Sequence, residues 1–336
     1  MMMINKVVID QRRRRNLLTL LALAAVTPAR SQISVRLPRV GFLDPSPAKF
    51  TQSRVRQFRA GLARLGYEDG KHYVLEYRSA EGQFDRLHTL ATELVLLPVR
   101  VMVVRNTPGT LAGRQATRTI PLVMADVGDP VELGFVQSLA RPGGNVTGPS
   151  NATLELLRKR LELLLDAFPS GHRIAILSNS ADQNTPLQIS EVQSAAARLR
   201  VELRVFDVRS EGGIDGALKQ ISAWKPNAML PLVNPIYRSD ISPRIVAWVP
   251  QHLIPVMHAF REEVEAGGLF AYSADLSDHY ERVAVYVARL LNGADPATLP
   301  IDRPTRFELT VNLKTAKALG ITFSHAVLAR ADRVIE

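Results

Sequence analysis

Apolar residues recur along this chain in two alternating patterns. Short apolar runs typical of buried strands are separated by segments in which apolar residues return every three or four positions, as in amphipathic helices. Up to residue 148 the runs predict strands at 39–43, 73–77, 99–104, 120–125 and 145–148. The spacing of Val55, Phe58, Leu62 and Leu65 predicts a helix that Gly66 ends, and further helices are predicted over 84–97 and from about Thr110.

The same alternation begins again after residue 150. It predicts helices over 154–168, 190–199 and 214–224, and strands at 173–177, 202–208 and 228–232. Strands that alternate with helices form a parallel sheet with helices on both faces. The 336 residues, 46% of them apolar, suffice for more than one hydrophobic core. We therefore predict an α/β protein of two Rossmann-like lobes with parallel sheets, joined by a hinge near residues 147–151.

The stretch from residue 128 to residue 148 is the most informative part of the sequence. The apolar run at 120–125 leads into the acidic loop Gly128-Asp129-Pro130, which is predicted to open a short helix. The turn Pro142-Gly143-Gly144 ends that helix and leads into the next strand. A carboxylate at the carboxyl end of a parallel strand lies where open α/β sheets place their ligands.

Four loops at the carboxyl ends of predicted strands carry polar residues that suit a small ligand. They hold Asp44 and Ser46 after the first strand, Asn106 and Thr107 after the third, Gly128 and Asp129 after the fourth, and Asn179, Ser180 and Asn184 in the second half. Asn106 precedes a helix whose N-terminal amides favour an anion, and Asp129 suits an ammonium group. Such residues also cap helices, so a capping role remains an alternative for each of them.

The N-terminus has the pattern of an export signal. Four arginines at 12–15 precede an apolar run at 17–26, which is too short to span a bilayer. Small residues near Ser31 predict cleavage there, so residues 1–31 are interpreted as a signal peptide. Arg14 and Arg15 also resemble a twin-arginine signal. A surface basic run leading into an ordinary core helix is the alternative.

Charge argues against nucleic acid as a partner. The formal net charge is +10, and removal of the leader leaves about +5. The remaining arginines, such as Arg54, Arg56, Arg59 and Arg64, are scattered rather than gathered in one basic patch.

Catalytic and cofactor-binding patterns are absent from the sequence. There is no cysteine, and the seven histidines are dispersed without metal-ligand spacing. No nucleophile elbow, phosphate-binding loop or dinucleotide fingerprint occurs. We therefore expect a protein that is not an enzyme and that needs no cofactor and no metal.

The segment 128–148, together with 265–272 and 307–320, resembles the solute-binding proteins of ABC transporters known for tryptophan and tyrosine uptake. The resemblance begins near Arg39 and covers nearly all of the chain after it. It implies the type I periplasmic-binding-protein fold, with lobe 1 at 36–150 plus about 274–296 and lobe 2 at 151–273 plus about 297–336. It also implies a periplasmic monomer that binds an aromatic or other amino acid between its lobes and docks on an inner-membrane permease with its ATPase.

The resemblance adds candidate ligand contacts and also shows departures. Asn234 and Tyr237 follow the strand at 228–232, and Tyr237, Phe260 and Tyr272 carry rings able to stack on an aromatic ligand, although core packing is the alternative for each. Asn106 and Ser273 stand where the family often has glycine, and Asn179-Ser180 stands where an Asn-Pro turn is common. These departures gather at the predicted pocket and leave the ligand open.

Two other functions remain open from the sequence alone. The same fold serves as a ligand-sensing module that works with a receptor rather than a transporter. An α/β enzyme with Asp129 as its base is the second alternative. Repressors with this fold carry an N-terminal DNA-binding segment, whereas this chain begins with a predicted leader.

Overall fold

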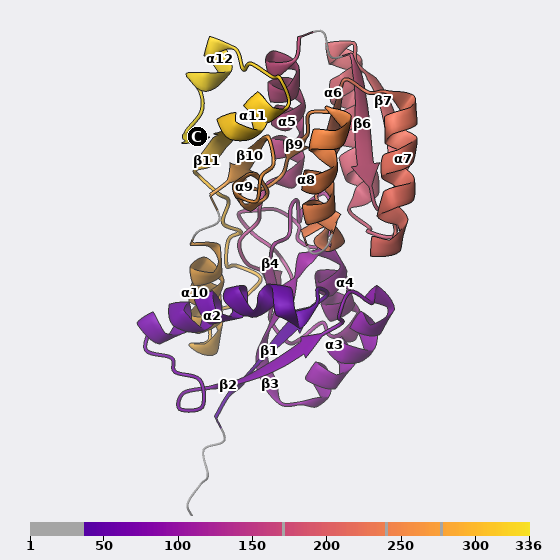
Figure 1. The fold of residues 1–336 in the computed structure, drawn as a ribbon. Helices are drawn as coiled ribbons and strands as arrows, with labels where there is room; N and C mark the ends of the chain where they lie inside the picture. Colours follow the sequence, from indigo (N-terminus) through magenta and orange to yellow (C-terminus); the bar gives the residue numbers. More distant parts are fainter. Residues whose placement is uncertain (1–36, 170–171, 239–240, 276–277) are drawn as a thin grey trace, which may run out of the picture. The chain divides into compact units, whose positions relative to one another are not determined.

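The computed structural model describes residues 37–169, 172–238, 241–275 and 278–336. Residues 37–336 form one compact unit, and the predicted signal peptide lies outside the described residues. Two groups of parallel strands with flanking helices make up this unit, which confirms the predicted α/β class (Figure 1). We call the residues that pack around the N-terminal sheet lobe 1 and those that pack around the C-terminal strands lobe 2.

Lobe 1 is built on a five-stranded parallel sheet with the order β2-β1-β3-β4-β5. Its strands are β1 (Arg39–Asp44), β2 (Val74–Ser79), β3 (Val99–Arg105), β4 (Leu122–Ala125) and β5 (Val146–Thr147). The helices of this part are α2 (Ala48–Arg64), α3 (Leu87–Leu96) and α4 (Asn106–Ala116), with a short 3₁₀ turn at Phe84–Arg86.

Side chains on alternate positions of these strands feed two cores, one on each face of the sheet. Val101 and Val103 of β3 pack with Phe58 of α2 on one face, whereas Met102 and Val104 pack on the other face with α3 and α4. Successive strand residues point to opposite faces, so a strand buried on both sides reads as a continuous apolar run. That is why β3 is apolar almost throughout.

Lobe 2 contains a three-stranded parallel sheet, β7-β6-β8, and a four-stranded sheet, β12-β11-β10-β9. A parallel bridge between Met229 and Val256 connects them. The strands are β6 (Arg173–Ser178), β7 (Glu202–Asp207), β8 (Ala228–Pro231), β9 (Met257–His258), β10 (Phe270–Ala274), β11 (Phe307–Asn312) and β12 (Arg333–Ile335). Strands β10 and β11 are antiparallel, which the alternating pattern did not predict.

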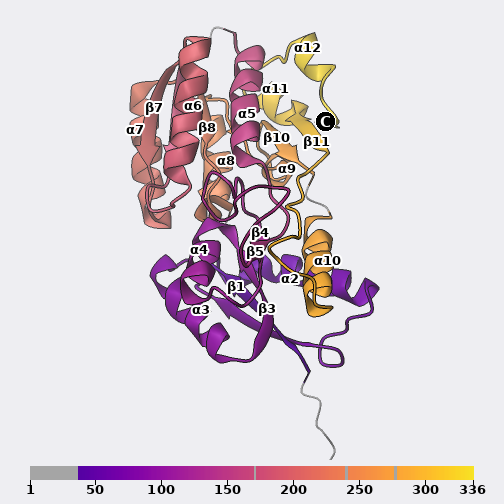
Figure 2. The same ribbon diagram turned by 180° about the vertical axis from the view of Figure 1, so that it is seen from behind.

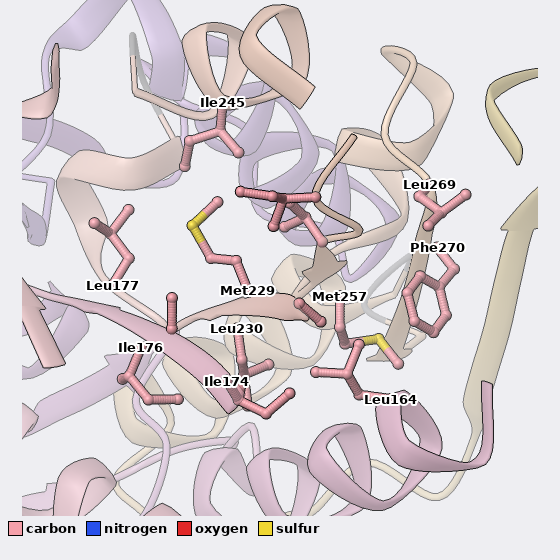
Figure 3. Close-up of a cluster of buried hydrophobic side chains, with 14 of the residues drawn as sticks. Leu164, Ile174, Ile176, Leu177, Met229, Leu230, Ile245, Met257, Leu269 and Phe270 are labelled. Atoms are coloured by element: carbon pink, nitrogen blue, oxygen red, sulfur yellow. The ribbon is translucent and has the colours of Figure 1, made fainter. Parts of the chain in front are cut away.

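The helices of lobe 2 surround one large core. They are α5 (Thr153–Ala167), α6 (Thr185–Leu199), α7 (Ile214–Trp224), α8 (Ile241–His252), α9 (Arg261–Glu265), α11 (Leu313–Ala318) and α12 (His325–Leu328), with 3₁₀ turns at Glu211–Gly213 and Pro235–Arg238. Leu164 of α5 meets Ile174 and Leu230 of the sheet in this core (Figure 3). Figure 2 shows α5 and α6 side by side against these strands.

The chain returns to lobe 1 late in the sequence. Helix α10 (His279–Leu291) packs against α2 and contributes Tyr280, Val283 and Val287 to the core that includes Phe58. Both views show α10 beside α2 (Figures 1 and 2). The segment after it also lies with lobe 1, because Leu299 and Ile301 are buried in the two cores of that lobe. These two residues lie just after position 297, near which the last lobe 2 segment is expected to begin.

Two local predictions differ from the structure. Residues 130–141 form turns rather than the predicted short helix, because Gly134 has a φ of 65° and the amide of Phe135 turns back to the carbonyl of Pro130. Helix α4 begins at Asn106 rather than near Thr110. Proline is accommodated in the first turn of a helix, where its missing N–H costs nothing, so Pro108 does not delay the start.

No helix in the part of the chain that the structure describes combines the length and apolar character needed to cross a membrane.

Candidate functional site

A pocket lies at the carboxyl ends of β1, β3 and β4, where lobe 1 meets lobe 2. From lobe 1 it is lined by Ser46, Arg54, Arg105, Asn106, Thr107, Asp126 and Gly128. From the rest of the chain it is lined by Asn151, Thr153, Asp182, Asn184, Val233, Asn234, Pro235 and Phe260. It encloses about 640 Å³ between atoms, counted with adjoining solvent.

The lobe 1 side of the pocket presents the N-terminus of α4. Asn106 begins this helix with a φ of 54°, a conformation that asparagine tolerates better than most residues. Its Nδ2 is buried and has no hydrogen-bond partner among the described residues. Thr107 is the next lining residue. An unpartnered amide donor beside a helix N-terminus suits a ligand carboxylate.

A buried charge network forms the floor of this side. Arg105 Nη1 donates to both oxygens of Asp44, at 2.6 and 2.8 Å, and Arg105 Nη2 donates to Asp126 at 2.9 Å. The Tyr280 hydroxyl donates to Asp126 at 2.6 Å. Burial lowers the pKa of Arg105, but electrostatic interactions with Asp44, Tyr280 and Asp126 outweigh burial and raise it above its ordinary value. Asp44 is fully buried and serves this network.

The lobe 2 side is an amide network around a single carboxylate. Asp182 Oδ1 accepts from the amide of Asn184 at 2.9 Å, and Oδ2 accepts from Asn234 Nδ2 at 2.7 Å. Asp182 is 3% exposed, and burial raises its pKa to about 6. No cationic side chain pairs with it in the described ranges. Asn184 Oδ1 and Asn151 Oδ1 are buried acceptors that likewise have no partner there.

Phe260 is the aromatic ring among the described lining residues, and buried polar groups hold its backbone. Glu263 Oε2 accepts from the amides of Ala259 and Phe260 at 3.1 and 3.0 Å. Arg160 Nη2 donates to the carbonyl of Ala259 at 3.1 Å, and Nε donates to the carbonyl of Tyr272 at 2.7 Å. Burial lowers the pKa of Arg160 to about 10, so the guanidinium is charged at neutral pH. The peptide before Phe260 is therefore fixed between opposite charges.

The structure brings together about half of the residues that the sequence nominated for ligand binding. Those that line the pocket are Ser46, Asn106, Thr107, Gly128, Asn184, Asn234 and Phe260. Those that do not line it are Asp44, Asp129, Asn179, Ser180, Tyr237 and Tyr272. Ligand contact stays a prediction for the first group.

Each residue of the second group has another place in the fold. Asp129 Oδ2 accepts from the amide of Leu154 at 3.0 Å, in the first turn of α5. Asn179 Nδ2 donates to Asn234, and the Ser180 hydroxyl donates to Asp207. Tyr237 is buried in the core of lobe 2, and Tyr272 stacks on Phe307 with ring centroids 6.2 Å apart.

Sequence reasoning missed several lining residues, namely Arg54, Arg105, Asp126, Asn151, Thr153, Asp182, Val233 and Pro235. Arg105 and Asp126 stand at or just after the ends of two predicted strands, so the rule that selected Asp44 and Asn106 covers them too. Asp182 lies two residues before Asn184, in the same loop as Asn179 and Ser180. No sequence pattern marks Arg54, which reaches the pocket from a helix.

The described residues hold no group of three or more His, Cys, Asp or Glu side chains that suits a metal ion. The arrangement instead offers donors, acceptors and one uncompensated carboxylate around a small pocket between two α/β lobes. That combination defines a two-lobe protein that binds a small polar molecule.

Comparison with known proteins gives the family. A family model described as ABC transporter substrate binding protein matches residues 50–335, and the chain belongs to that family. It is therefore a substrate-binding protein of an ABC transporter, as the resemblance predicted. Members bind a small molecule, generally outside the cytoplasm, and work with a transporter permease. The family is one of binding proteins rather than enzymes.

Individual relatives agree with this membership. A tyrosine-binding protein of Clostridioides difficile (strain R20291) is 25% identical over 264 residues, which are 79% of this chain and 75% of that protein. A Streptococcus pneumoniae ABC domain solved in complex with L-Trp is 26% identical, with a TM-score of 0.81, over 89% of this chain and all of that one. A conserved domain protein of Vibrio cholerae is 28% identical, with a TM-score of 0.82 over the same shares.

Proposed function

We propose that this protein binds a free α-amino acid in the pocket between its lobes and delivers it to an inner-membrane permease. The observation that carries this proposal is the charge of Asp182, which is buried in the pocket among neutral amides. A buried charge without a counter-charge is costly, so it marks a place where a ligand cation completes the site. An α-ammonium group is such a cation.

The remaining polar groups fit the other end of the same ligand. Asn151 Oδ1 and Asn184 Oδ1 accept hydrogen bonds, which suits the ammonium. Asn106 Nδ2 and the N-terminus of α4 suit the α-carboxylate on the lobe 1 side. A zwitterion therefore connects the two lobes, and Phe260 offers a ring to its side chain. The relatives named for tyrosine and for L-Trp make these two amino acids the first candidates.

A thermal-shift screen of the 20 amino acids tests the proposal. A ligand that binds only the folded protein stabilises it by mass action and so raises its melting temperature. At a ligand concentration of 100 times Kd, the unfolding free energy rises by about 2.7 kcal/mol. The bound amino acid should be recovered unchanged after incubation, whereas conversion to a product would favour the enzyme alternative. A screen in which no amino acid shifts the melting temperature would contradict the proposal.

Transport is proposed over sensing because the chain belongs to a transporter family. We also propose that it is exported as a monomer, with residues 1–31 removed, so that the pocket faces the periplasm. Uptake of labelled ligand should fail in cells that lack the gene and return when the gene is restored. Normal uptake without the gene would favour the sensing role.

A further inference from the structure

A buried side chain connects the two loops that form the lobe 2 wall of the pocket. Gln188 is fully buried in the first turn of α6, and its backbone amide donates to the carbonyl of Asn184 at 3.1 Å. Its side chain reaches the other loop, which follows β8 and contributes Val233 and Asn234 to the pocket. Gln188 is therefore bonded to both loops, although it does not line the pocket itself.

Two hydrogen bonds make the contact with the second loop. Gln188 Nε2 donates to the carbonyl of Val233 at 2.9 Å, and Gln188 Oε1 accepts from the amide of Val233 at 2.9 Å. One residue earlier, the amide of Leu232 still donates to the carbonyl of Leu177 in β6. Just past the end of the sheet, a side-chain amide thus satisfies both backbone groups of one residue, as a neighbouring strand would.

The peptide that Gln188 fixes leads directly into Asn234. Asn234 is 2% exposed, and its Nδ2 donates to Asp182 Oδ2 at 2.7 Å. Its Oδ1 accepts from the amide of Ile236 at 3.1 Å, which holds the side chain in one orientation. Since Asp182 Oδ1 accepts from the amide of Asn184, the two loops together bind both oxygens of this carboxylate.

We propose that Gln188 is a positioning residue for ligand binding, which holds Val233 so that Asn234 keeps the Asp182 carboxylate in place for a ligand cation. The inference rests on the proposed binding of an α-amino acid at Asp182. A hydrogen bond donated to a carboxylate stabilises its charged form. Loss of the Asn234 bond therefore both releases Asp182 and disfavours its ionisation, which a loss of stability elsewhere in lobe 2 does not do.

The ionisation of Asp182 gives a test that needs no ligand. Burial raises its pKa to about 6 with the Asn234 bond in place. The buried titratable neighbour, Tyr237, stays protonated over this range, because burial and the charges of Asp207 and Asp182 raise its pKa. The titration midpoint measured near pH 6 therefore reports on the carboxylate alone.

NMR titration of the ligand-free mature protein, labelled at its aspartate carboxyl carbons, measures that midpoint. Asp182→Asn assigns the signal. Gln188→Met has a side chain of similar length that cannot hold Val233, so the Asp182 midpoint should lie at least about 0.5 pH unit higher than in the unmodified protein. Asn234→Ala removes the donor directly and should raise the midpoint in the same way. In that background, Gln188→Met should add little, because the group that it positions is gone.

Affinity is the second measurement. The probe is L-tyrosine or L-tryptophan, whichever the unmodified protein binds more tightly in calorimetric titration at pH 7.5. Its Kd should be at least about fivefold higher in Gln188→Met, since hydrogen bonds to charged groups are stronger than those between neutral groups. If Gln188→Met does not fold, Gln188→Asn carries the test, because its shorter side chain cannot reach Val233 in the same way and leaves room for water.

Val192→Ala is the matched control. Val192 is fully buried on the same helix, packs in the core of lobe 2 and does not line the pocket. This variant should lower the unfolding free energy while leaving the Asp182 midpoint and the Kd unchanged. An unchanged midpoint or an unchanged Kd in the folded Gln188 variant, or equal shifts in Val192→Ala, would overturn the positioning role. If the midpoint rose as expected but the unmodified protein bound no amino acid, the failure would lie with the proposed function.

Discussion

Asp129, which is half-buried, and Asp182, which is buried, both have a pKa raised to about 6, but they have different neighbours. Burial is the main cause of the shift in each case. Asp182 lines the pocket, whereas Asp129 accepts a hydrogen bond from the amide of Leu154 outside its lining. The same shift therefore predicts a binding effect at one residue and a stability effect at the other.

Ligand affinity should weaken as the pH falls through 6. An ammonium group pairs with the ionised form of Asp182, and a carboxyl of pKa about 6 is only about one-tenth ionised at pH 5. Kd measured by calorimetry should rise about fivefold to tenfold between pH 7.5 and pH 5. Asp182→Asn should bind at least tenfold more weakly at pH 7.5 and should lose this pH dependence. If Asp129→Asn caused the loss and Asp182→Asn did not, the ammonium would belong at Asp129.

Asp129→Asn should change stability rather than affinity. A folded-state pKa above the unfolded value of 3.8 means that the folded state holds its proton more tightly. Stability from this group is therefore greatest at low pH and falls as the pH rises from about 4 to about 6. Asparagine keeps an oxygen for the amide of Leu154 and removes the charge. The fall in unfolding free energy between about pH 4 and pH 6 should therefore be about 1–2 kcal/mol smaller in the variant than in the unmodified protein. Urea unfolding at pH 4 and pH 7 measures this, and an unchanged pH slope would contradict it.

At the level of elements, the loop before α9 depends on groups that do not line the pocket. Arg160 and Glu263 hold the peptide before Phe260, so they act on a ligand through the position of that ring. Arg160→Met should lower affinity for an aromatic amino acid about threefold to tenfold. It should also lower the unfolding free energy by about 2–4 kcal/mol, because the carbonyls of Ala259 and Tyr272 lose a buried donor and Glu263 loses a nearby positive charge.

A double-mutant cycle separates positioning from general damage. In a Phe260→Ala background, Arg160→Met should cost little further affinity, because the ring that it positions is gone. Both affinities are measured below the unfolding transition of the weaker variant. Additive losses would show that Arg160 affects binding by another route.

The same elements show why some of the site was predictable. Asn106, Gly128 and Asn184 follow strands or precede helices, and parallel strands place those positions at one edge. Tyr272 does not line the pocket, because its ring points to the other face of β10, where it stacks on Phe307. Asp129 lies outside the lining because its side chain accepts a hydrogen bond from the amide of Leu154 in the first turn of α5. Arg160 was not predictable, since it follows Arg158 and Lys159 in a basic run and nothing in the sequence marks its distant carbonyl partners.

For the whole molecule, export is the property most open to test. The mature protein should begin near residue 32, and N-terminal sequencing of periplasmic material would show it. Arg14→Lys combined with Arg15→Lys should leave the precursor in the cytoplasm if the twin-arginine route is used. Normal export of this double variant would assign the general secretory route, and a mature protein with an intact N-terminus would remove the export proposal.

Helix α10 also decides when the molecule can fold. The core of lobe 1 that includes Phe58 is closed by Tyr280, Val283 and Val287, which leave the ribosome more than 200 residues after Phe58. A domain normally folds when its last core element has been made. The hydrophobic core of lobe 1 therefore stays incomplete until almost the whole polypeptide has been synthesised. That delay keeps the newly made chain open to chaperones.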